Sequence, residues 1–173
     1  SRALPLWRAY LELCKPKVVA LMLITAVVGL LLAPTKHFSW WTSVIGLVGI
    51  ALAAGSAAVI NHMVDKEIDQ KMMRTHKRPI PTGRVQPKQA FIFATLLCLT
   101  SMVLLLVFVN PLTAELSFLS LIGYALFYTL FLKHQTPQNI VIGGATGAAP
   151  PLLGWTAMTN SLDANAWLLM LII

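Results

Sequence analysis

The stretch NHMVDKEIDQKMMRTHKRPIPTGRV, residues 61–85, concentrates charge in a chain that otherwise has little of it. The chain has 173 residues, of which 57% are hydrophobic and 11% are charged. Three of its six acidic residues and seven of its thirteen lysines and arginines fall within this stretch or directly after it. The uneven distribution indicates that the chain has two environments, one apolar and one polar.

The uncharged part of the chain is too apolar for an ordinary water-soluble domain, in which about 25% of residues are charged. Mean hydropathy is +0.75. Uncharged runs occupy residues 18–35, 89–114, 116–132 and 135–162, and about 20 apolar residues carry a helix across a bilayer. A soluble α-helical domain would need polar faces on its surface helices, which these runs lack. The composition therefore predicts an all-α, polytopic transmembrane helical bundle.

We expect five complete membrane-spanning helices and the start of a sixth. The predicted spans are residues 16–32, 42–61, 87–109, 112–132 and 137–155, with the sixth opening near Asn165. The chain begins with Ser and ends inside the apolar run WLLMLII. We therefore expect residues 1–173 to be a single membrane domain that forms the amino-terminal portion of a longer protein, truncated within its sixth helix.

The distribution of lysine and arginine predicts the orientation of these spans, because short loops rich in these residues stay in the cytoplasm. Cations cluster before the first span and after the second, whereas the loop between those spans has only Lys36. We thus expect an integral membrane protein of the bacterial inner membrane, with its amino terminus and charged stretch in the cytoplasm. The net charge of +7 then reflects membrane lipid and an anionic substrate, not nucleic acid, for which no binding module is present. Cys14 and Cys98 show no pairing pattern.

Asn61, Asp65 and Asp69 recur at every fourth position, so on a helix they form one edge rich in oxygen. This edge lies at the cytoplasmic end of the second predicted span. Two carboxylates and an amide suit Mg²⁺, which binds through one or two carboxylates together with substrate phosphate oxygens. The spacing therefore predicts a metal site at Asn61, Asp65 and Asp69.

Three cations, Arg74, Lys77 and Arg78, follow this edge within one short loop. Guanidinium groups bind phosphate oxygens with two parallel hydrogen bonds, so acids and cations together suit a metal-bound diphosphate. The alternative is a solvated helix end with exposed ion pairs. We assign Lys66 and Glu67 to that alternative because they point away from the Asn61 edge.

Small residues and prolines mark the helices that pack closely. Ala51 with Gly55, and Gly143 with Gly147, have the spacing that lets helix backbones approach each other in lipid. The two prolines at 150–151 remove two backbone donors and should break or kink the fifth span. Such a break is tolerated where protein or a polar cavity satisfies the freed groups, although a packing kink without a ligand is equally compatible.

The sequence does not decide the roles of the four histidines and of two tyrosines. Each histidine has a solvated or hydrogen-bonded alternative to a ligand role, and each tyrosine has an interfacial alternative to a place in a cavity. The histidines are His37, His62, His76 and His134, and the tyrosines are Tyr124 and Tyr128.

The pattern N-x-x-x-D-x-x-x-D followed by R-T-x-x-R-P and a glycine resembles the first aspartate-rich motif of the UbiA superfamily of intramembrane prenyltransferases. Two further segments, LCKPKVVALMLITAVVG at 13–29 and TPQNIVIGGATGAAPPLLGW at 136–155, resemble the branch of that superfamily that farnesylates haem B. The resemblance covers essentially the whole chain.

This resemblance implies a nine-helix fold around a central cavity, with two aspartate-rich motifs that face each other through Mg²⁺ and a prenyl diphosphate. The first motif matches Asn61, Asp65 and Asp69, with Asp65 and Asp69 as catalytic residues, and the second would lie beyond Ile173. The family's diphosphate-binding positions match Arg74, Arg78, Lys133 and, more weakly, Lys15.

The implied reaction transfers a farnesyl group from farnesyl diphosphate to the vinyl group of haem B, with Mg²⁺ as cofactor, and gives haem O for a terminal oxidase. An association with haem A synthase or with terminal-oxidase assembly fits that reaction, although no residue indicates it. Because part of the motif set is missing, residues 1–173 alone should be inactive.

Two other functions remain open from the residues. An aromatic prenyltransferase of the 4-hydroxybenzoate type would share the aspartate motif and differ in its acceptor pocket. An ion or solute transporter could use a buried Asn/Asp edge, but its acids should lie near the middle of the membrane. The predicted position of Asp65 and Asp69 at the cytoplasmic rim favours the enzyme.

Overall fold

The computed structural model describes residues 5–71, 73, 75–125 and 147–173. All regular structure in these ranges is helical, which confirms the predicted all-α class. The helices are α1 (Leu6–Leu13), α2 (Pro16–Leu32), α3 (Trp40–Val64), α4 (Lys66–Lys71), α5 (Pro87–Phe108), α6 (Pro111–Ile122), α8 (Ala149–Thr159) and α9 (Ala164–Ile172).

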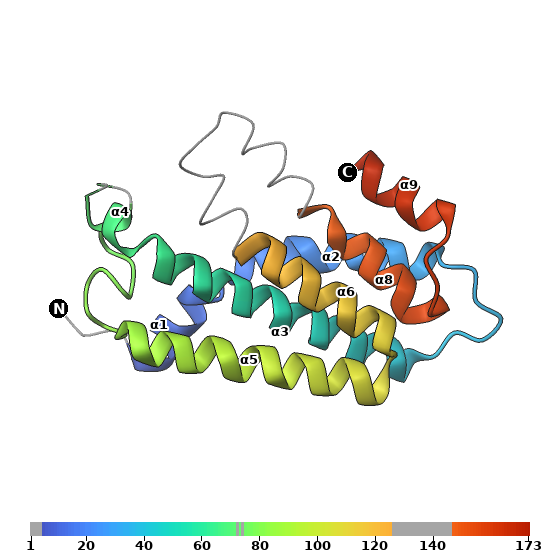
Figure 1. Cartoon of the computed structure of the whole chain (residues 1–173), viewed down its shortest axis with the longest axis horizontal. Helices are drawn as coiled ribbons and strands as arrows, with labels where there is room; N and C mark the ends of the chain where they lie inside the picture. The colour runs from blue at the N-terminus through green and yellow to red at the C-terminus, as the bar shows by residue number, and fades with distance from the viewer. Residues whose placement is uncertain (1–4, 72, 74, 126–146) are drawn as a thin grey trace.

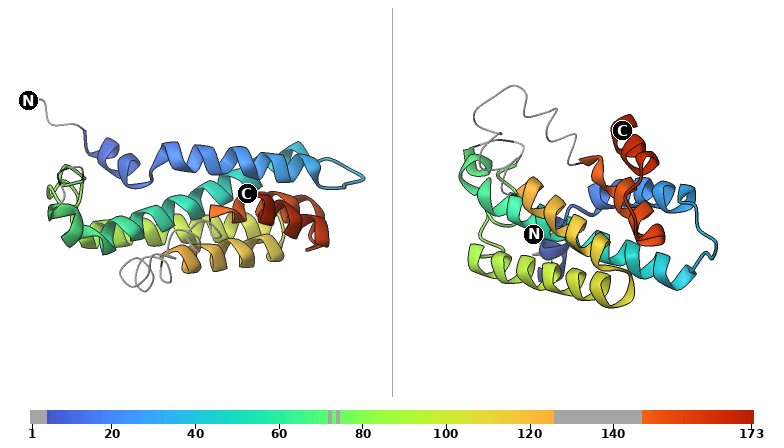
Figure 2. Two further views of the ribbon diagram at one scale, coloured as in Figure 1. Left: turned by 90° about the horizontal axis from the view of Figure 1, so that it is seen from above. Right: turned by 45° about the vertical axis from the view of Figure 1, so that its right-hand side comes forward.

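Helix α3 lies at the centre of the bundle (Figure 1) and packs against α2, α5, α6 and α8. Seen from above, α2 lies on one side of α3, and α5 and α6 lie on the other (Figure 2). The short helices α1 and α4 and residues 75–86 gather at the end where α3 finishes and α5 begins. We call this the charged end, and we call the opposite end, at the turn between α5 and α6, the far end.

Two of the described helices, α3 and α5, are long and apolar enough to cross a membrane. The bent pair of α1 and α2 makes a third if it is one span, with an angle of 47° between the two helices. The predicted spans at 16–32 and 87–109 agree closely with α2 and α5, and α3 extends the second predicted span at both ends. Exposed leucine, valine and phenylalanine side chains cover the outer faces of α2 and α5, as expected for helices that contact lipid.

Small residues and hydroxyl groups join α3 to α5. The Ser101 hydroxyl donates to the Gly49 carbonyl at 2.6 Å, and the Ser56 hydroxyl donates to the Ala94 carbonyl at 2.8 Å. Both serines are completely buried. In lipid, where apolar side chains gain little by leaving their surroundings, such close contacts and interhelical hydrogen bonds hold helices together.

The closest backbone approach joins α2 to α8 through Gly29 and Gly154. A Cβ at Gly29 would overlap the Pro151 carbonyl oxygen, and a Cβ at Gly154 would overlap the Ala26 carbonyl oxygen. A Cβ at Gly147 would meet no described atom within 4 Å, so the close contact predicted for this glycine stays a prediction. Its predicted partner, Gly143, lies outside the described residues.

The two prolines at 150–151 lie where helix α8 begins, within the fifth predicted span. Helix α8 begins at Ala149, so both prolines occupy its first turn, where a missing backbone N–H costs no helical hydrogen bond. The helix then continues to Thr159 and does not stop at Trp155. The part of the predicted span before Gly147 lies outside the described residues.

The fourth predicted span is described only in its first part. Helix α6 ends at Ile122 and widens into a π-type turn over residues 123–125. Residues 126–132 of the prediction lie outside the described ranges. The sixth predicted span opens as expected, since Asp163 caps α9 by accepting a hydrogen bond from the Ala166 N–H at 3.1 Å.

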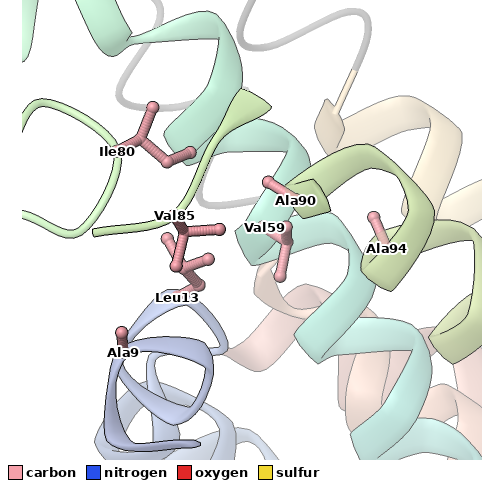
Figure 3. Close-up of a cluster of buried hydrophobic side chains, with 7 residues drawn as sticks. All are labelled: Ala9, Leu13, Val59, Ile80, Val85, Ala90 and Ala94. Atoms are coloured by element: carbon pink, nitrogen blue, oxygen red, sulfur yellow. The ribbon is translucent and has the colours of Figure 1, made fainter. Parts of the chain in front are cut away.

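Helix α1 was not predicted, because its eight residues mix apolar and charged side chains. Its inner face contributes Ala9 and Leu13 to a buried cluster at the charged end (Figure 3). Ile80 and Val85 join this cluster from the loop before α5, and the remaining members are Val59, Ala90 and Ala94. The cluster therefore fixes the loop that follows the aspartates onto α1, α3 and α5.

Candidate functional site

Three oxygen-bearing side chains are buried at the charged end. Asn61 is 6% exposed, and Asp65 and Asp69 are each 3% exposed. Their neighbour Glu67 is exposed and Lys66 is half-buried, in agreement with the prediction that these two belong to the solvated side. Buried carboxylates are rare in proteins unless they are paired or bind a metal, so this edge is a candidate functional site.

The three residues do not lie on one unbroken helix. Helix α3 ends at Val64, Asp65 caps it, and α4 begins at Lys66. The spacing is nevertheless kept, because the Asp65 N–H donates to the Asn61 carbonyl at 3.0 Å and the Asp69 N–H donates to the Asp65 carbonyl at 2.8 Å. Because the helix breaks at Asp65, Asp69 lies on the separate helix α4, from which the chain turns toward the loop that carries Arg78.

Arg78, in the loop between α4 and α5, forms an ion pair with Asp69. Its Nη1 donates to both carboxylate oxygens, at 2.9 Å to Oδ1 and 2.7 Å to Oδ2. The Asp69 side chain is 4% exposed and that of Arg78 is 27% exposed. The buried Thr75 hydroxyl donates to the Asp69 backbone carbonyl at 3.2 Å. Arg78 therefore pairs with a buried acid while its own side chain remains partly exposed.

Asn61 connects the acidic edge to helix α6. Its Nδ2 donates to the Tyr124 hydroxyl at 3.1 Å, and Tyr124 lies in the π-type turn. The buried Asn61 Oδ1 accepts no hydrogen bond from any described residue. This oxygen is therefore a buried acceptor with unused capacity, which is what a cation or a donor group of a ligand requires.

An apolar cleft of about 170 Å³ begins beside Tyr124 and runs between α2, α3, α6 and α8. Its wall on α3 consists mainly of alanines, and its floor includes Ile50 and Leu153. Tyr124 lines the cleft, so of the two alternatives for this residue the structure supports the one in the cavity. The arrangement joins a polar, charged rim to an apolar chamber.

Lys15 lies at the rim of the same cleft. It caps α2 with the left-handed backbone conformation φ 50° and ψ 61°, which is uncommon for a residue other than glycine. This conformation makes the elbow between α1 and α2. Of the cations predicted to bind diphosphate, Lys15 and Arg78 are thus both placed at the charged end of the bundle.

The other predicted site residues fall into two groups. Arg74 and Lys133 lie outside the described residues, as do His134 and Tyr128. His62 is buried next to Asn61, whereas His37 and His76 are exposed. The structure leaves any role for these histidines as a prediction.

The donor set at the charged end fits a hard cation. Asn61, Asp65 and Asp69 offer only oxygen, and an ionised carboxylate that binds one arginine keeps lone pairs for a further partner. Among the described residues, no cluster of three or more histidine, cysteine or acidic side chains could hold a metal by itself. Mg²⁺ takes few protein ligands and completes its shell with water and phosphate oxygens, and its binding at this edge stays a prediction.

A family model for the UbiA prenyltransferase family matches residues 22–173. The chain belongs to the UbiA prenyltransferase family. Membership of this family explains why an acidic edge, a basic loop and an apolar cleft occur together in one helical bundle.

Curated relatives of this UbiA family chain are named protoheme IX farnesyltransferase. The chain is 61% identical to one from Vibrio campbellii over 164 residues, 95% of the chain and 54% of the relative. It is 60% identical to one from Pseudomonas fluorescens over 168 residues, 97% of the chain and 56% of the relative. The chain therefore spans about half the length of the curated relatives it matches.

Solved structures share the fold of this UbiA family chain. One, of a digeranylgeranylglyceryl phosphate synthase in membranes, has a TM-score of 0.83 and 23% identity, covering 96% of the chain and 57% of that protein. Another, a UbiA homolog from Archaeoglobus fulgidus bound to DMAPP and Mg²⁺, has a TM-score of 0.73 and 18% identity, covering 93% and 58%. At these identities the likeness concerns the fold.

Two contacts of the site were missed by reasoning from the sequence. Thr75 is buried against Asp69, and Tyr124 pairs with Asn61 across 63 positions of sequence. A lone threonine in a basic loop carries no signal. The tyrosine had one, since it lies in an uncharged run where a buried hydroxyl needs a partner, but the sequence did not indicate which.

Proposed function

We propose that the protein containing this chain transfers a farnesyl group from farnesyl diphosphate to the vinyl group of haem B and so makes haem O. The observation that carries the proposal is 61% identity, over 95% of the chain, to a relative named protoheme IX farnesyltransferase. Because the chain spans about half of that relative, the activity is proposed for the whole protein and not for residues 1–173 alone.

The diphosphate of the donor would bind at the charged end. Asp69 already aligns Arg78 there through Nη1, so the other N–H groups of the guanidinium need little reordering to meet a phosphate oxygen. We assign Asp65, Asp69 and Asn61 to a Mg²⁺ ion shared with the diphosphate, and this ion would supply charge neutralisation to the leaving group. Lys15 lies on the same rim, and Arg74 and Lys133 remain predicted contacts.

The farnesyl chain would extend into the apolar cleft. Alanines on α3 leave room for it, and Tyr124 marks where the cleft meets the polar rim. As the bond between carbon and diphosphate oxygen lengthens, positive charge develops on the allylic carbon. A cleft without water protects that carbon until the vinyl group of haem supplies its electrons, after which water adds and completes the hydroxyethylfarnesyl group.

We place this protein in the bacterial inner membrane, with its amino terminus and charged end in the cytoplasm. The orientation rests on the lysines and arginines at the charged end, against the single Lys36 in the loop between α2 and α3. It also puts the diphosphate site on the side where soluble farnesyl diphosphate and Mg²⁺ are available. The relatives named above come from bacteria.

An acceptor assay tests the proposal directly. The assay protein is the full-length protein that contains residues 1–173, which we call the completed protein. Membranes containing it receive farnesyl diphosphate, Mg²⁺ and either haem B or 4-hydroxybenzoate, and products are identified by mass. We expect a farnesylated, hydrated haem and no farnesylated benzoate. Prenylation of the benzoate alone would assign the chain to the aromatic branch instead.

A further inference from the structure

An open groove lies on the outside of the elbow between α1 and α2, separate from the acidic edge. It has a volume of about 510 Å³. Its lining residues are Trp7, Arg8, Leu11, Glu12, Lys15, Pro16, Lys17 and Val18. The 47° bend between the two helices creates this groove, because a straight helix would close it.

The groove has one apolar and one cationic component. Trp7, Leu11 and Val18 are 61%, 48% and 53% exposed, which is unfavourable unless lipid or another apolar partner covers them. Arg8 and Lys17 are also exposed, and the Arg8 guanidinium lies 5.4 Å from the centre of the Trp7 ring. Exposed tryptophan and leucine beside arginine and lysine are typical of a helix that lies in the headgroup region of a bilayer.

The acid in the groove does not cancel this positive charge. Glu12 pairs with Arg84 from the loop, with 3.2 Å between Nη2 and Oε2. Arg84 also donates to the Lys77 carbonyl at 3.0 Å. The exposed cations of the groove are therefore Arg8 and Lys17, and Lys15 lines both this groove and the apolar cleft. The resulting positive field favours an anionic occupant.

We propose that this groove binds an anionic phospholipid of the surrounding membrane. The phosphate would meet the cations, and the first carbons of an acyl chain would cover Trp7, Leu11 and Val18. A free phosphate or diphosphate would use only the cations and leave the apolar wall uncovered. A protein partner would have to enter the headgroup region, where lipid is always present at high concentration.

Occupancy of the groove would reach the donor site through α1. Leu13 packs with Ile80 and Val85 in the buried cluster of Figure 3, and Glu12 pairs with Arg84 of the same loop. Arg78, which lies two residues before Ile80, pairs with Asp69. A lipid that holds α1 at the membrane surface therefore also holds the loop that presents Arg78. This consequence rests on the proposed function, whereas binding of the lipid does not.

Lipid binding is tested with the completed protein in a neutral detergent. Short-chain phosphatidylglycerol, phosphatidylcholine or inorganic phosphate is added, and bound molecules are counted by native mass spectrometry. We expect phosphatidylglycerol to bind at least tenfold more tightly than phosphatidylcholine, and inorganic phosphate not to displace it. Equal affinity for the two lipids would overturn the proposal, and displacement by equimolar inorganic phosphate would assign the groove to a free anion.

Paired variants locate the binding. Arg8→Gln combined with Lys17→Gln should weaken phosphatidylglycerol about tenfold or more, since each cation near an anionic surface contributes to binding. Lys36→Gln removes an exposed cation from the opposite loop and should change nothing. Leu11→Ser keeps every cation, so it should weaken the lipid and leave phosphate binding unaltered. Unchanged affinity in the double variant would place the lipid elsewhere.

The coupling to the donor site has its own readout. The completed protein is assayed in bilayers of phosphatidylcholine alone, or of phosphatidylcholine and phosphatidylglycerol mixed three to one. We expect the anionic lipid to lower the KM for farnesyl diphosphate in the unaltered protein and in Lys36→Gln, but not in the double variant. If phosphatidylglycerol still binds but the KM is the same in both bilayers, the coupling would be overturned and the lipid-binding site would stand.

Discussion

Two buried polar clusters, one at each end of the bundle, differ in how fully they use their hydrogen bonds. At the far end, the Asn110 Nδ2 donates to the Thr156 carbonyl at 2.9 Å, and its Oδ1 accepts from the Thr113 N–H at 2.8 Å. The Thr113 and Thr156 hydroxyls lie 3.0 Å apart. Asn110 thereby uses both ends of its amide within the protein.

The charged end has the opposite character. Asn61 is as buried as Asn110, at 6% against 8% exposed, yet its Oδ1 accepts nothing from the described residues. Two buried aspartates accompany it, whereas the far-end cluster is neutral. A satisfied neutral cluster fixes helices in lipid, whereas a charged cluster with an unused acceptor costs stability unless a ligand completes it. The comparison indicates a structural role for the far end and supports the proposal that the charged end binds a ligand.

The largest effect should follow the loss of one carboxylate. In the completed protein, Asp65→Asn keeps the shape of a buried side chain and removes its charge, so we expect kcat/KM for farnesyl diphosphate to fall by about 100-fold or more, the scale of losing one preorganised electrostatic contact. Product formation at saturating haem B measures it. The control is Glu67→Gln, which removes an exposed acid two positions away. Equal losses in both variants would mean that overall charge matters and the edge does not.

The next largest effect should follow a change in the contact between α2 and α8. Gly154→Ala places a methyl group against the Ala26 carbonyl of α2, and overpacking of this kind costs typically about 1–3 kcal/mol. We expect a lower unfolding midpoint in detergent, with KM for farnesyl diphosphate unchanged in the folded fraction. Gly147→Ala is the matched control, since its new Cβ meets no described atom within 4 Å. Equal midpoints for the two variants would remove the close approach from the account.

A smaller effect should follow replacement of Arg78, whose guanidinium pairs with Asp69. Arg78→Lys keeps the positive charge, but it removes the Nε–H and Nη2–H groups that could bind a phosphate oxygen while Nη1 holds Asp69. We expect the KM for farnesyl diphosphate to rise roughly tenfold, which corresponds to about 1.4 kcal/mol. Arg84→Lys, in the same loop but paired with Glu12, should leave KM within about twofold. A rise in KM for Arg84→Lys of equal size would show that the loop as a whole, and not Arg78, binds the donor.

The sequence predicted the long helices well, because an uncharged run of sufficient length has few alternatives to a helix in lipid. The bounds of α2 were predicted as the structure has them, and those of α5 to within one residue. The amphipathic α1 was missed because its eight residues are too few to span a membrane and its two charges, Arg8 and Glu12, resemble a flanking segment. The close approach of α2 and α8 at Gly29 and at Gly154 was missed because it joins two helices, and spacing within one helix carries no information about its partner.

The candidate site was predictable in its residue types and not in its pairing. The four-residue spacing of Asn61, Asp65 and Asp69 predicted one edge, which is buried in the structure. The basic loop supplies a guanidinium to this edge. The break of the helix at Asp65, the choice of Arg78 as partner of Asp69, and the bond from Asn61 to Tyr124 depend on how the loop and α6 return to α3. Those are tertiary contacts, which spacing along the chain does not encode.

The most direct test of the difference between the two ends compares Asn61→Ala with Asn110→Ala in the completed protein. Two quantities are measured for each variant: the Mg²⁺ concentration that gives half-maximal turnover, and the unfolding midpoint. We predict that Asn61→Ala raises the Mg²⁺ requirement at least tenfold with little change in midpoint. Asn110→Ala should leave the Mg²⁺ requirement alone and cost about 1–3 kcal/mol, because it leaves the Thr113 N–H buried without its acceptor. An Asn61→Ala protein that is destabilised but needs no more Mg²⁺ would contradict the account.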